Sequence, residues 1–249
     1  MNIVVCLKQL TQATDTEDSN AISPYDMYML KQAVTYKKNH SDVTIICLTM
    51  GPVSSESMLR RALSLGCDEA IRITDVCYSG SDTIATSYVL SEAIKRIDQV
   101  GAILCGKKSL DGETGFVGPS IAGLLNIPYL TQVTEIEEVQ ENELLVTALE
   151  EKYITNYKIE MPCVLCMDGI DTYLGTKSLF SIRKARNYTI PVWDNEILEL
   201  NPIKCGMEGS STKVLSIISR DTDKKSNEIL QDVSEAVERV ISEINVFCE

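Results

Sequence analysis

The sequence of 249 residues has little of several residue types, and each shortage excludes a class of protein. Its one histidine, His40, lies in the polar stretch KKNHSD, so no Ser-His-Asp or Cys-His catalytic arrangement is available. Lysine and arginine (23) are outnumbered by aspartate and glutamate (36), and the net charge of −13 argues against a nucleic-acid-binding or generally membrane-binding surface.

Long apolar segments and common phosphate motifs are missing as well. No apolar run reaches the length of a membrane span, and Met1-Asn2 lacks a signal peptide's basic region, so we expect a cytoplasmic protein with no membrane insertion. The GxGxxG motif is absent. Residues 101–108, GAILCGKK, nearly match GxxxxGK[ST], but Lys108 occupies the magnesium-binding position and AILC has the composition of a strand, which excludes a P-loop.

Cysteine is present in an odd number, nine, and mostly in apolar surroundings. Reduced thiols behave there as small hydrophobic residues, which suits a reducing compartment. Cys163 and Cys166 form a CxxC pair, but a strand would send them to opposite faces and no second pair or histidine completes a zinc site. Core thiols are therefore favoured over a redox or metal site, and we expect no metal.

Strand-like and helix-like segments alternate along the first half of the chain. This alternation predicts βαβ crossovers and a parallel sheet, that is, an α/β, Rossmann-like fold. Helices are expected to start at Ser23-Pro24, at Ser54, and at Ser81 or Asp82. The strands are predicted at residues 3–7, 43–49, 69–74 and 102–106.

Two later regions depart from this alternation. Strand-like runs separated by turns over residues 129–167 predict a small antiparallel extension. Residues 191–249 contain prolines, a Gly/Ser-rich stretch and an amphipathic helix near 228–246. We expect a core domain of residues 1–190 and a C-terminal helical arm of residues 191–249. The final helix packs either on its own domain or, as we favour, on another chain.

The most glycine-rich stretch follows the fourth strand: CGKKSLDGETGFVGPSIAGLLNIP. Ligands of open α/β sheets bind beyond the carboxyl ends of the strands, where residues 6–8 and 50–52 also lie. Gly115 and Gly118 would let backbone N–H groups approach an anion, and Pro119 is placed to start a helix whose N-terminus favours phosphate. We expect a phosphate or pyrophosphate site; the alternative is a tight connection that needs glycine for positive φ.

Several stretches together carry a resemblance: VVCLKQ, SPYDMYMLKQAV, MGPVSSESMLRRALSLGCDEAIRI, CGKKSLDGETGFVGPSIAGLLNIP and SLFSIRKARN. In order and spacing they resemble the beta subunit of electron transfer flavoprotein over most of residues 1–190. The resemblance implies an adenine-nucleotide-binding α/β core in a heterodimer whose alpha subunit carries the principal FAD, with the C-terminal arm packing on that subunit. It implies an electron carrier rather than a free-standing enzyme.

The resemblance also implies a nucleotide site. Its residues would be Cys6, Ser23, Pro24, Tyr25, Asp26, Met50, Gly106, Lys107, Lys108, Ser109, Leu110, Asp111, Gly112, Glu113, Thr114, Gly115, Phe116 and Val117. We expect the backbone at Cys6 and Met50 to bind the adenine edge. The N–H groups from Thr114 to Val117 would bind phosphate, together with the Thr114 hydroxyl. Asp111 would either accept from a ribose hydroxyl or form an Asx-turn.

The loop motif DGETG followed by VGP resembles the branch of the family that binds FAD in this subunit, so FAD is favoured over AMP. Phe116 and Lys108 stand where the family commonly has glutamine, and Ser23 replaces a frequent asparagine. With FAD, electrons from NADH would be bifurcated between a low-potential carrier such as ferredoxin or flavodoxin and the alpha-subunit FAD. With AMP, the nucleotide would be structural and the protein would relay electrons, typically from an acyl-CoA dehydrogenase.

The segment TKSLFSIRKAR resembles the family's recognition loop, with Leu179 as the leucine that anchors the dehydrogenase. An apolar anchor beside basic residues suits docking on an acidic partner. The alternative is that Leu179 and Ile182 pack on the core and the basic residues are only solvated. The basic residues are Lys177, Arg183, Lys184 and Arg186.

Two other classes of function stay open. A nucleotide-binding regulatory protein of the universal-stress type shares the sheet, but it would need neither the arm nor the Leu179 segment. A self-sufficient oxidoreductase is disfavoured because neither a dinucleotide fingerprint nor an acid/base pair is visible.

Overall fold

The computed structural model describes residues 1–10, 22–140, 142–170, 177–212 and 232–247. The chain divides into two compact units, Met1–Lys213 and Val214–Glu249, and each is described here by itself. The predicted division at residue 190 and the packing of the arm on an alpha subunit stay predictions.

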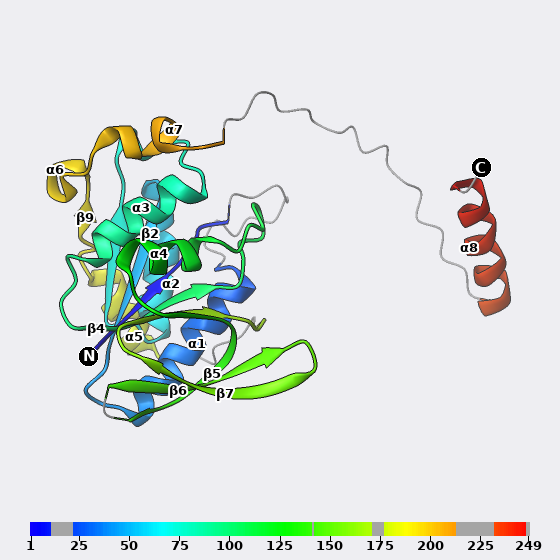
Figure 1. Cartoon of the computed structure of the whole chain (residues 1–249), viewed down its shortest axis with the longest axis horizontal. Coiled ribbons are helices and arrows are strands. Elements are labelled where there is room, and N and C mark those ends of the chain that lie inside the picture. The colour runs from blue at the N-terminus through cyan, green and yellow to red at the C-terminus, as the bar shows by residue number, and fades with distance from the viewer. Residues whose placement is uncertain (11–21, 141, 171–176, 213–231, 248–249) are drawn as a thin grey trace. The chain divides into compact units, whose positions relative to one another are not determined.

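Helices and strands alternate in the first half of the larger unit, as predicted (Figure 1). The elements are β1 (Asn2–Cys6), α1 (Pro24–Asn39), β2 (Thr44–Met50), α2 (Glu56–Leu65), β3 (Glu69–Ile73), α3 (Thr83–Ile94), β4 (Val100–Gly106) and α4 (Val117–Leu125). The rest of the unit contains β5 (Tyr129–Gln140), β6 (Glu143–Glu150), β7 (Tyr153–Glu160), β8 (Cys163–Met167), α5 (Leu179–Asn187), β9 (Val192–Trp193), α6 (Asn195–Leu198) and α7 (Gly206–Gly209). Short 3₁₀ turns are η1 (Val53–Ser55), η2 (Val76–Tyr78) and η3 (Pro202–Lys204).

The strands form one nine-stranded sheet in the order β7-β6-β5-β8-β4-β1-β2-β3-β9. Neighbouring strands pair in parallel along the series β5-β8-β4-β1-β2-β3-β9. The pairs β5–β6 and β6–β7 are antiparallel. This confirms an α/β fold with an antiparallel extension. One expectation was wrong: β8 is not hairpin-joined to the extension but lies parallel between β4 and β5. All five β8 residues are buried, and a strand covered on both faces belongs in the parallel core.

Helices cover both faces of the sheet, which explains the continuous apolar runs of its central strands. One hydrophobic cluster joins Ile3 and Val5 to buried residues of α1 and α2, such as Met29 and Met58. The other joins Val4 on the opposite face to α3 and α4. The sheet edge at which β1, β2 and β4 end is therefore held between two helical layers.

Helix ends follow the predicted signals closely, with two corrections. The start expected at Ser54 falls in the 3₁₀ turn η1, and α2 begins at Glu56. Pro24 is in the first turn of α1, and α2 ends at Leu65 with Gly66 as its cap, whose φ of 129° suits glycine. Asp82 caps α3. The expectation that Pro119 starts α4 was wrong, since α4 begins at Val117. A proline fits there because first-turn N–H groups have no intrahelical acceptor.

Residues 191–212 belong to the larger unit. β9 pairs with β3, and the next segment buries Leu198, Leu200 and Cys205. In the smaller unit, α8 (Val233–Phe247) exposes a row of apolar side chains at Val233, Val237, Val240 and Ile241. Across the residues that the structure describes, no helix combines the length and apolarity of a membrane span.

Candidate functional site

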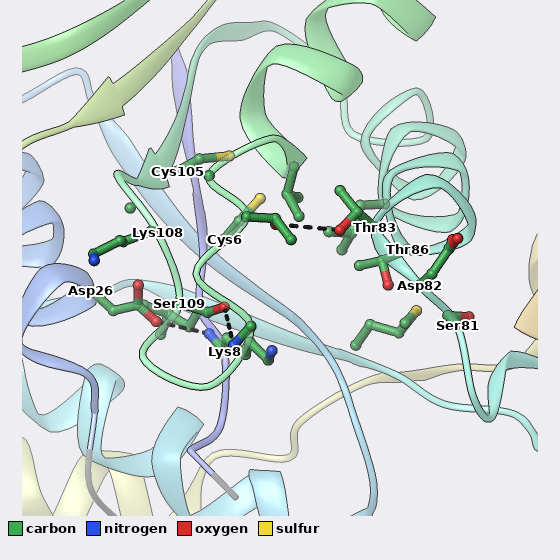
Figure 2. Close-up of a pocket in the computed structure, with 18 of the residues that line it drawn as sticks. Cys6, Lys8, Asp26, Ser81, Asp82, Thr83, Thr86, Cys105, Lys108 and Ser109 are labelled. Atoms are coloured by element: carbon green, nitrogen blue, oxygen red, sulfur yellow. Dashed lines mark hydrogen bonds between the residues drawn. The ribbon is translucent and has the colours of Figure 1, made fainter. Parts of the chain in front are cut away.

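A cavity of about 400 Å³ lies at the carboxyl ends of β1, β2 and β4, where an open α/β sheet binds its ligands (Figure 2). The N-terminal turn of α3 closes one side, so Thr83 and Thr86 face Asp26 and Lys108 across the cavity. Its lining residues are Cys6, Leu7, Lys8, Asp26, Leu48, Met50, Ser81, Asp82, Thr83, Thr86, Leu90, Cys105, Gly106, Lys108, Ser109, Gly112, Thr114, Gly115 and Val117.

The predicted nucleotide-site residues divide into two groups. Those that line the cavity are Cys6, Asp26, Met50, Gly106, Lys108, Ser109, Gly112, Thr114, Gly115 and Val117. The others lie on the same segments but not in the lining: Ser23, Pro24, Tyr25, Lys107, Leu110, Asp111, Glu113 and Phe116. Their part in nucleotide binding stays a prediction. The Phe116 side chain is 66% exposed, and the Lys107 ammonium pairs with Asp168.

Four lining residues at the start of α3 were not among the predicted nucleotide-site residues: Ser81, Asp82, Thr83 and Thr86. Ser81 and Asp82 were considered only as helix caps. The sequence could have indicated these residues, because they follow β3, a predicted parallel strand. Its carboxyl end lies at the same sheet edge as those of β1, β2 and β4. Lys8 belongs to the strand end at residues 6–8 where a ligand was expected, and it lines the cavity, although it was not among the predicted nucleotide-site residues.

Asp82 holds two segments together at the rim of the cavity. Its Oδ1 accepts the N–H groups of Ile84 (2.9 Å) and Ala85 (3.0 Å) at the start of α3. Its Oδ2 accepts the N–H groups of Ser211 (2.8 Å) and Thr212 (3.1 Å). Burial alone would raise the pKa of Asp82, but the hydrogen bonds from these backbone groups outweigh it and lower the pKa.

The loop after β4 is shaped by its own side chains. Asp111 Oδ1 accepts the N–H of Gly112 (2.7 Å) and the ammonium of Lys8 (2.7 Å). Burial would raise the pKa of Asp111, but Lys8, Ser109 and Gly112 lower it to about 2. This geometry supports the loop-stabilising role of Asp111. Gly115 has a φ of 67°, a left-handed backbone conformation that glycine adopts without strain.

The cavity is bordered by the backbone of Thr114 and Gly115. Within the described part of the chain, the N–H groups of Thr114, Gly115 and Phe116 have no acceptor. The Thr83 hydroxyl donates to the Thr114 hydroxyl (3.3 Å), which brings the start of α3 to the loop that leads into α4. Two helix N-termini and unpaired N–H groups on one cavity make a setting that fits a phosphate.

Glycine is needed at position 118 for helix packing, not for the approach of an anion as expected. A Cβ at Gly118 would lie 2.5 Å from Cys166 Sγ and 3.1 Å from Cys105 Cβ. The missing side chain therefore lets α4 pack closely on β4 and β8. We infer that Gly118 serves helix packing, while Gly115 serves the loop.

Asp26 lies buried in the cavity wall. Its Oδ2 accepts the Lys8 N–H (2.9 Å), and a Cβ at Gly106 would be 2.8 Å from its Oδ1, so glycine is needed at the end of β4. Burial raises the pKa of Asp26 to about 7, although the N–H and the charge of Lys8 oppose this. The carboxyl can therefore hold a proton near neutral pH and donate it in a hydrogen bond.

Thiols line the sheet beneath the cavity. Cys105 is opposite Cys166 in the β4–β8 register, and the β1–β4 register places Cys6 on its other side. A hydrogen bond with Cys6, and then burial, raise the pKa of Cys105 well above its usual range. The cysteines that the structure describes are free thiols. Cys163 and Cys166 lie in clusters on opposite faces of the sheet, as the strand period predicts.

The predicted docking segment forms α5, which starts after the cap residue Ser178. Leu179 is 86% exposed and Phe180 78% exposed, so the alternative that Leu179 packs on the core was wrong. Lys184 is also exposed, whereas Ala185 is buried. The helix therefore presents an apolar N-terminal end and basic side chains to solvent.

Comparison with known proteins agrees with this geometry. A family model described as "Electron transfer flavoprotein domain" matches residues 12–194, well over half of the chain. The chain belongs to the electron transfer flavoprotein family.

Relatives in this family match the chain over nearly its full length. It is 32% identical to Protein FixA of Azotobacter vinelandii (93% of this chain, 88% of the relative). It is 30% identical to the electron transfer flavoprotein subunit beta of Thermoanaerobacterium thermosaccharolyticum (98% of each). It is also 30% identical to the caffeyl-CoA reductase-Etf complex subunit CarD of Acetobacterium woodii (88% of each). The predicted beta-subunit type is thus confirmed, and the universal-stress alternative is not favoured.

Proposed function

We propose that this electron transfer flavoprotein subunit binds the adenylate part of FAD in the cavity at the ends of β1, β2 and β4. The observation that carries the proposal is the unpaired backbone at Thr114 and Gly115, two residues that line a cavity bordered by the N-termini of α3 and α4. Those N–H groups and the Thr83 hydroxyl would hold phosphate. The backbone at Cys6 and Met50 would bind the adenine edge.

The size of the cavity bears on the choice of nucleotide. About 400 Å³ lies near the lower end of the range for small-molecule sites, which is roughly 300–1,000 Å³. One nucleotide fits such a volume, so an FAD held here by its adenylate would extend beyond the cavity. AMP is the second candidate because it would need no space outside. The DGETG and VGP motifs favour FAD.

The chain's own residues would bind and orient the cofactor and keep water from its phosphates. When bound, FAD would supply two-electron exchange with NADH and one-electron exchange with other carriers, which no side chain provides. We propose that the chain works with an alpha subunit that carries a further FAD, in the cytoplasm, and that bifurcation sends one electron to ferredoxin or flavodoxin. CarD, by its name, belongs to a reductase-Etf complex.

We also propose that α5 docks an acyl-CoA dehydrogenase or a similar dehydrogenase. The exposed side chains of Leu179 and Phe180 would give apolar contact, and the basic residues that follow would speed encounter with an acidic surface.

The nucleotide proposal is tested by composition. The chain is co-purified with its alpha subunit, the complex is denatured, and FAD and AMP are counted per heterodimer. Two FAD and no AMP are expected. One FAD and one AMP would replace the proposal with the structural-AMP function. One FAD with no second adenylate would overturn the assignment of the cavity.

A further inference from the structure

Arg60 of α2 binds the end of α5. Its Nη1 donates to the backbone carbonyl oxygens of Ala185 (2.9 Å), Arg186 (3.0 Å) and Tyr188 (3.0 Å). Its Nη2 donates to Glu56, one turn earlier on α2. One guanidinium thus joins three carbonyls that follow one another closely at the C-terminal end of the docking helix.

These carbonyls need an external donor. The last carbonyl groups of an α-helix have no intrahelical partner, and the helix dipole makes that end negative. A guanidinium has several N–H donors for the unpaired carbonyls and a permanent positive charge that the negative helix end attracts. Glu56 holds the other nitrogen, which fixes the direction of the Arg60 side chain.

The N-terminal end of α5 is more exposed than its attached C-terminal end. Ala185 is its one buried residue, and at its other end Leu179 and Phe180 are largely exposed. Leu179 lies eight residues from the end of the helix, which is about 12 Å along the axis. A small tilt about the attached end therefore displaces Leu179 more than any other residue of the helix.

We propose that Arg60 is a positioning residue for docking: by binding the C-terminal carbonyls of α5, it sets the direction in which Leu179 meets the dehydrogenase. The inference rests on the proposed docking function of α5. In this inference Arg60 affects docking through the position of α5 and not through contact with the dehydrogenase.

The test uses the purified heterodimer and an acyl-CoA dehydrogenase that reduces the unsubstituted protein. Arg60→Met keeps the length of the side chain and removes the donors. We expect the KM for the heterodimer to rise roughly 10-fold at nearly unchanged kcat, because alignment of the docking contact is lost before electron transfer. Arg60→Lys, which keeps the charge, should recover part of the loss.

Three further measurements separate positioning from general damage. Hydrogen exchange in Arg60→Met should speed up at residues 182–188 and stay unchanged in β1 and β4. Arg96→Met is the matched control, because Arg96 Nη2 donates to the Leu198 carbonyl (2.8 Å) at the end of α6, away from α5. Its KM should not change. In a Leu179→Ala background, Arg60→Met should have little additional effect, since Arg60 acts through Leu179.

The outcomes distinguish the inference from the function on which it rests. If Leu179→Ala leaves the KM unchanged, the docking proposal fails. If Leu179→Ala raises the KM but Arg60→Met does not, the positioning inference is overturned. Should Arg60→Met not fold, Glu56→Met provides the second variant, because it removes the acceptor of Arg60 Nη2 and frees the guanidinium to move: a raised KM supports the inference, and an unchanged KM together with unchanged exchange in α5 contradicts it.

Discussion

Asp26 is the side chain in the cavity whose charge is most sensitive to pH. Its buried carboxyl accepts the Lys8 N–H, and burial raises its pKa from 3.8 to about 7. The folded protein therefore binds a proton that the unfolded chain releases between these two pH values. The stability that this proton gives is complete below pH 3.8 and is lost as the pH rises toward 7.

We predict that Asp26→Asn removes this part of the pH dependence. Asparagine still accepts the Lys8 N–H but does not titrate. In the parent protein, ionisation of Asp26 should lower the free energy of unfolding by up to ~4 kcal/mol between pH 3.8 and 7. Urea unfolding across that range measures the slope, and an equal slope in parent and variant would contradict the buried-acid description.

Cys6 gives a chemical probe of the cavity. It is half-buried and lines the cavity, whereas Cys77 is half-buried elsewhere and burial raises its pKa to about 12. We predict that a bound adenylate slows alkylation of Cys6 by N-ethylmaleimide, while Cys77 reacts slowly with or without ligand. Mass spectrometry of peptides reads both sites. Equal labelling of Cys6 in loaded and nucleotide-free heterodimer would show that the ligand lies elsewhere.

At the scale of elements, α4 depends on one close approach to the sheet. Gly118→Ala would place a Cβ against Cys166 and Cys105 and push the helix away from β4 and β8. We predict a loss of about 1–3 kcal/mol in the free energy of unfolding. Gly123→Ala is the control on the same helix, since a Cβ there meets nothing within 4 Å and alanine favours helix by roughly 0.5–1 kcal/mol. Denaturant unfolding of both variants should show opposite signs.

The elements themselves were largely predictable because local signals specify them. Pro24, Gly66 and Asp82 mark helix ends through their own backbone or side-chain chemistry. The place of β8 was not predictable from local pattern, because its five apolar residues suit either kind of pairing and the choice depends on β4 and β5. Likewise, the approach of Thr83 to Thr114 depends on two segments that are distant in sequence.

At the scale of the whole molecule, charge and apolar contact should act separately in docking. The chain is strongly acidic, so the basic side chains of α5 stand out against a negative background. We predict that Lys184→Gln slows association with the dehydrogenase roughly 2–5-fold at low ionic strength and much less at high salt. Leu179→Ala should instead speed dissociation at every salt concentration. Stopped-flow kinetics separates the two rates, and a salt-independent Lys184 effect would contradict the encounter role.

The two carboxylate oxygens of Asp82 bind different segments. One accepts an N–H group of α3, and the other accepts the N–H groups of residues 211 and 212, shortly before the larger unit ends. Tension applied to the chain after residue 212 would act first on the hydrogen bonds to the Asp82 carboxylate. The same carboxylate fixes the helix start that borders the cavity. Tension on residues 211 and 212 would therefore pass through one side chain to the helix start beside the cavity.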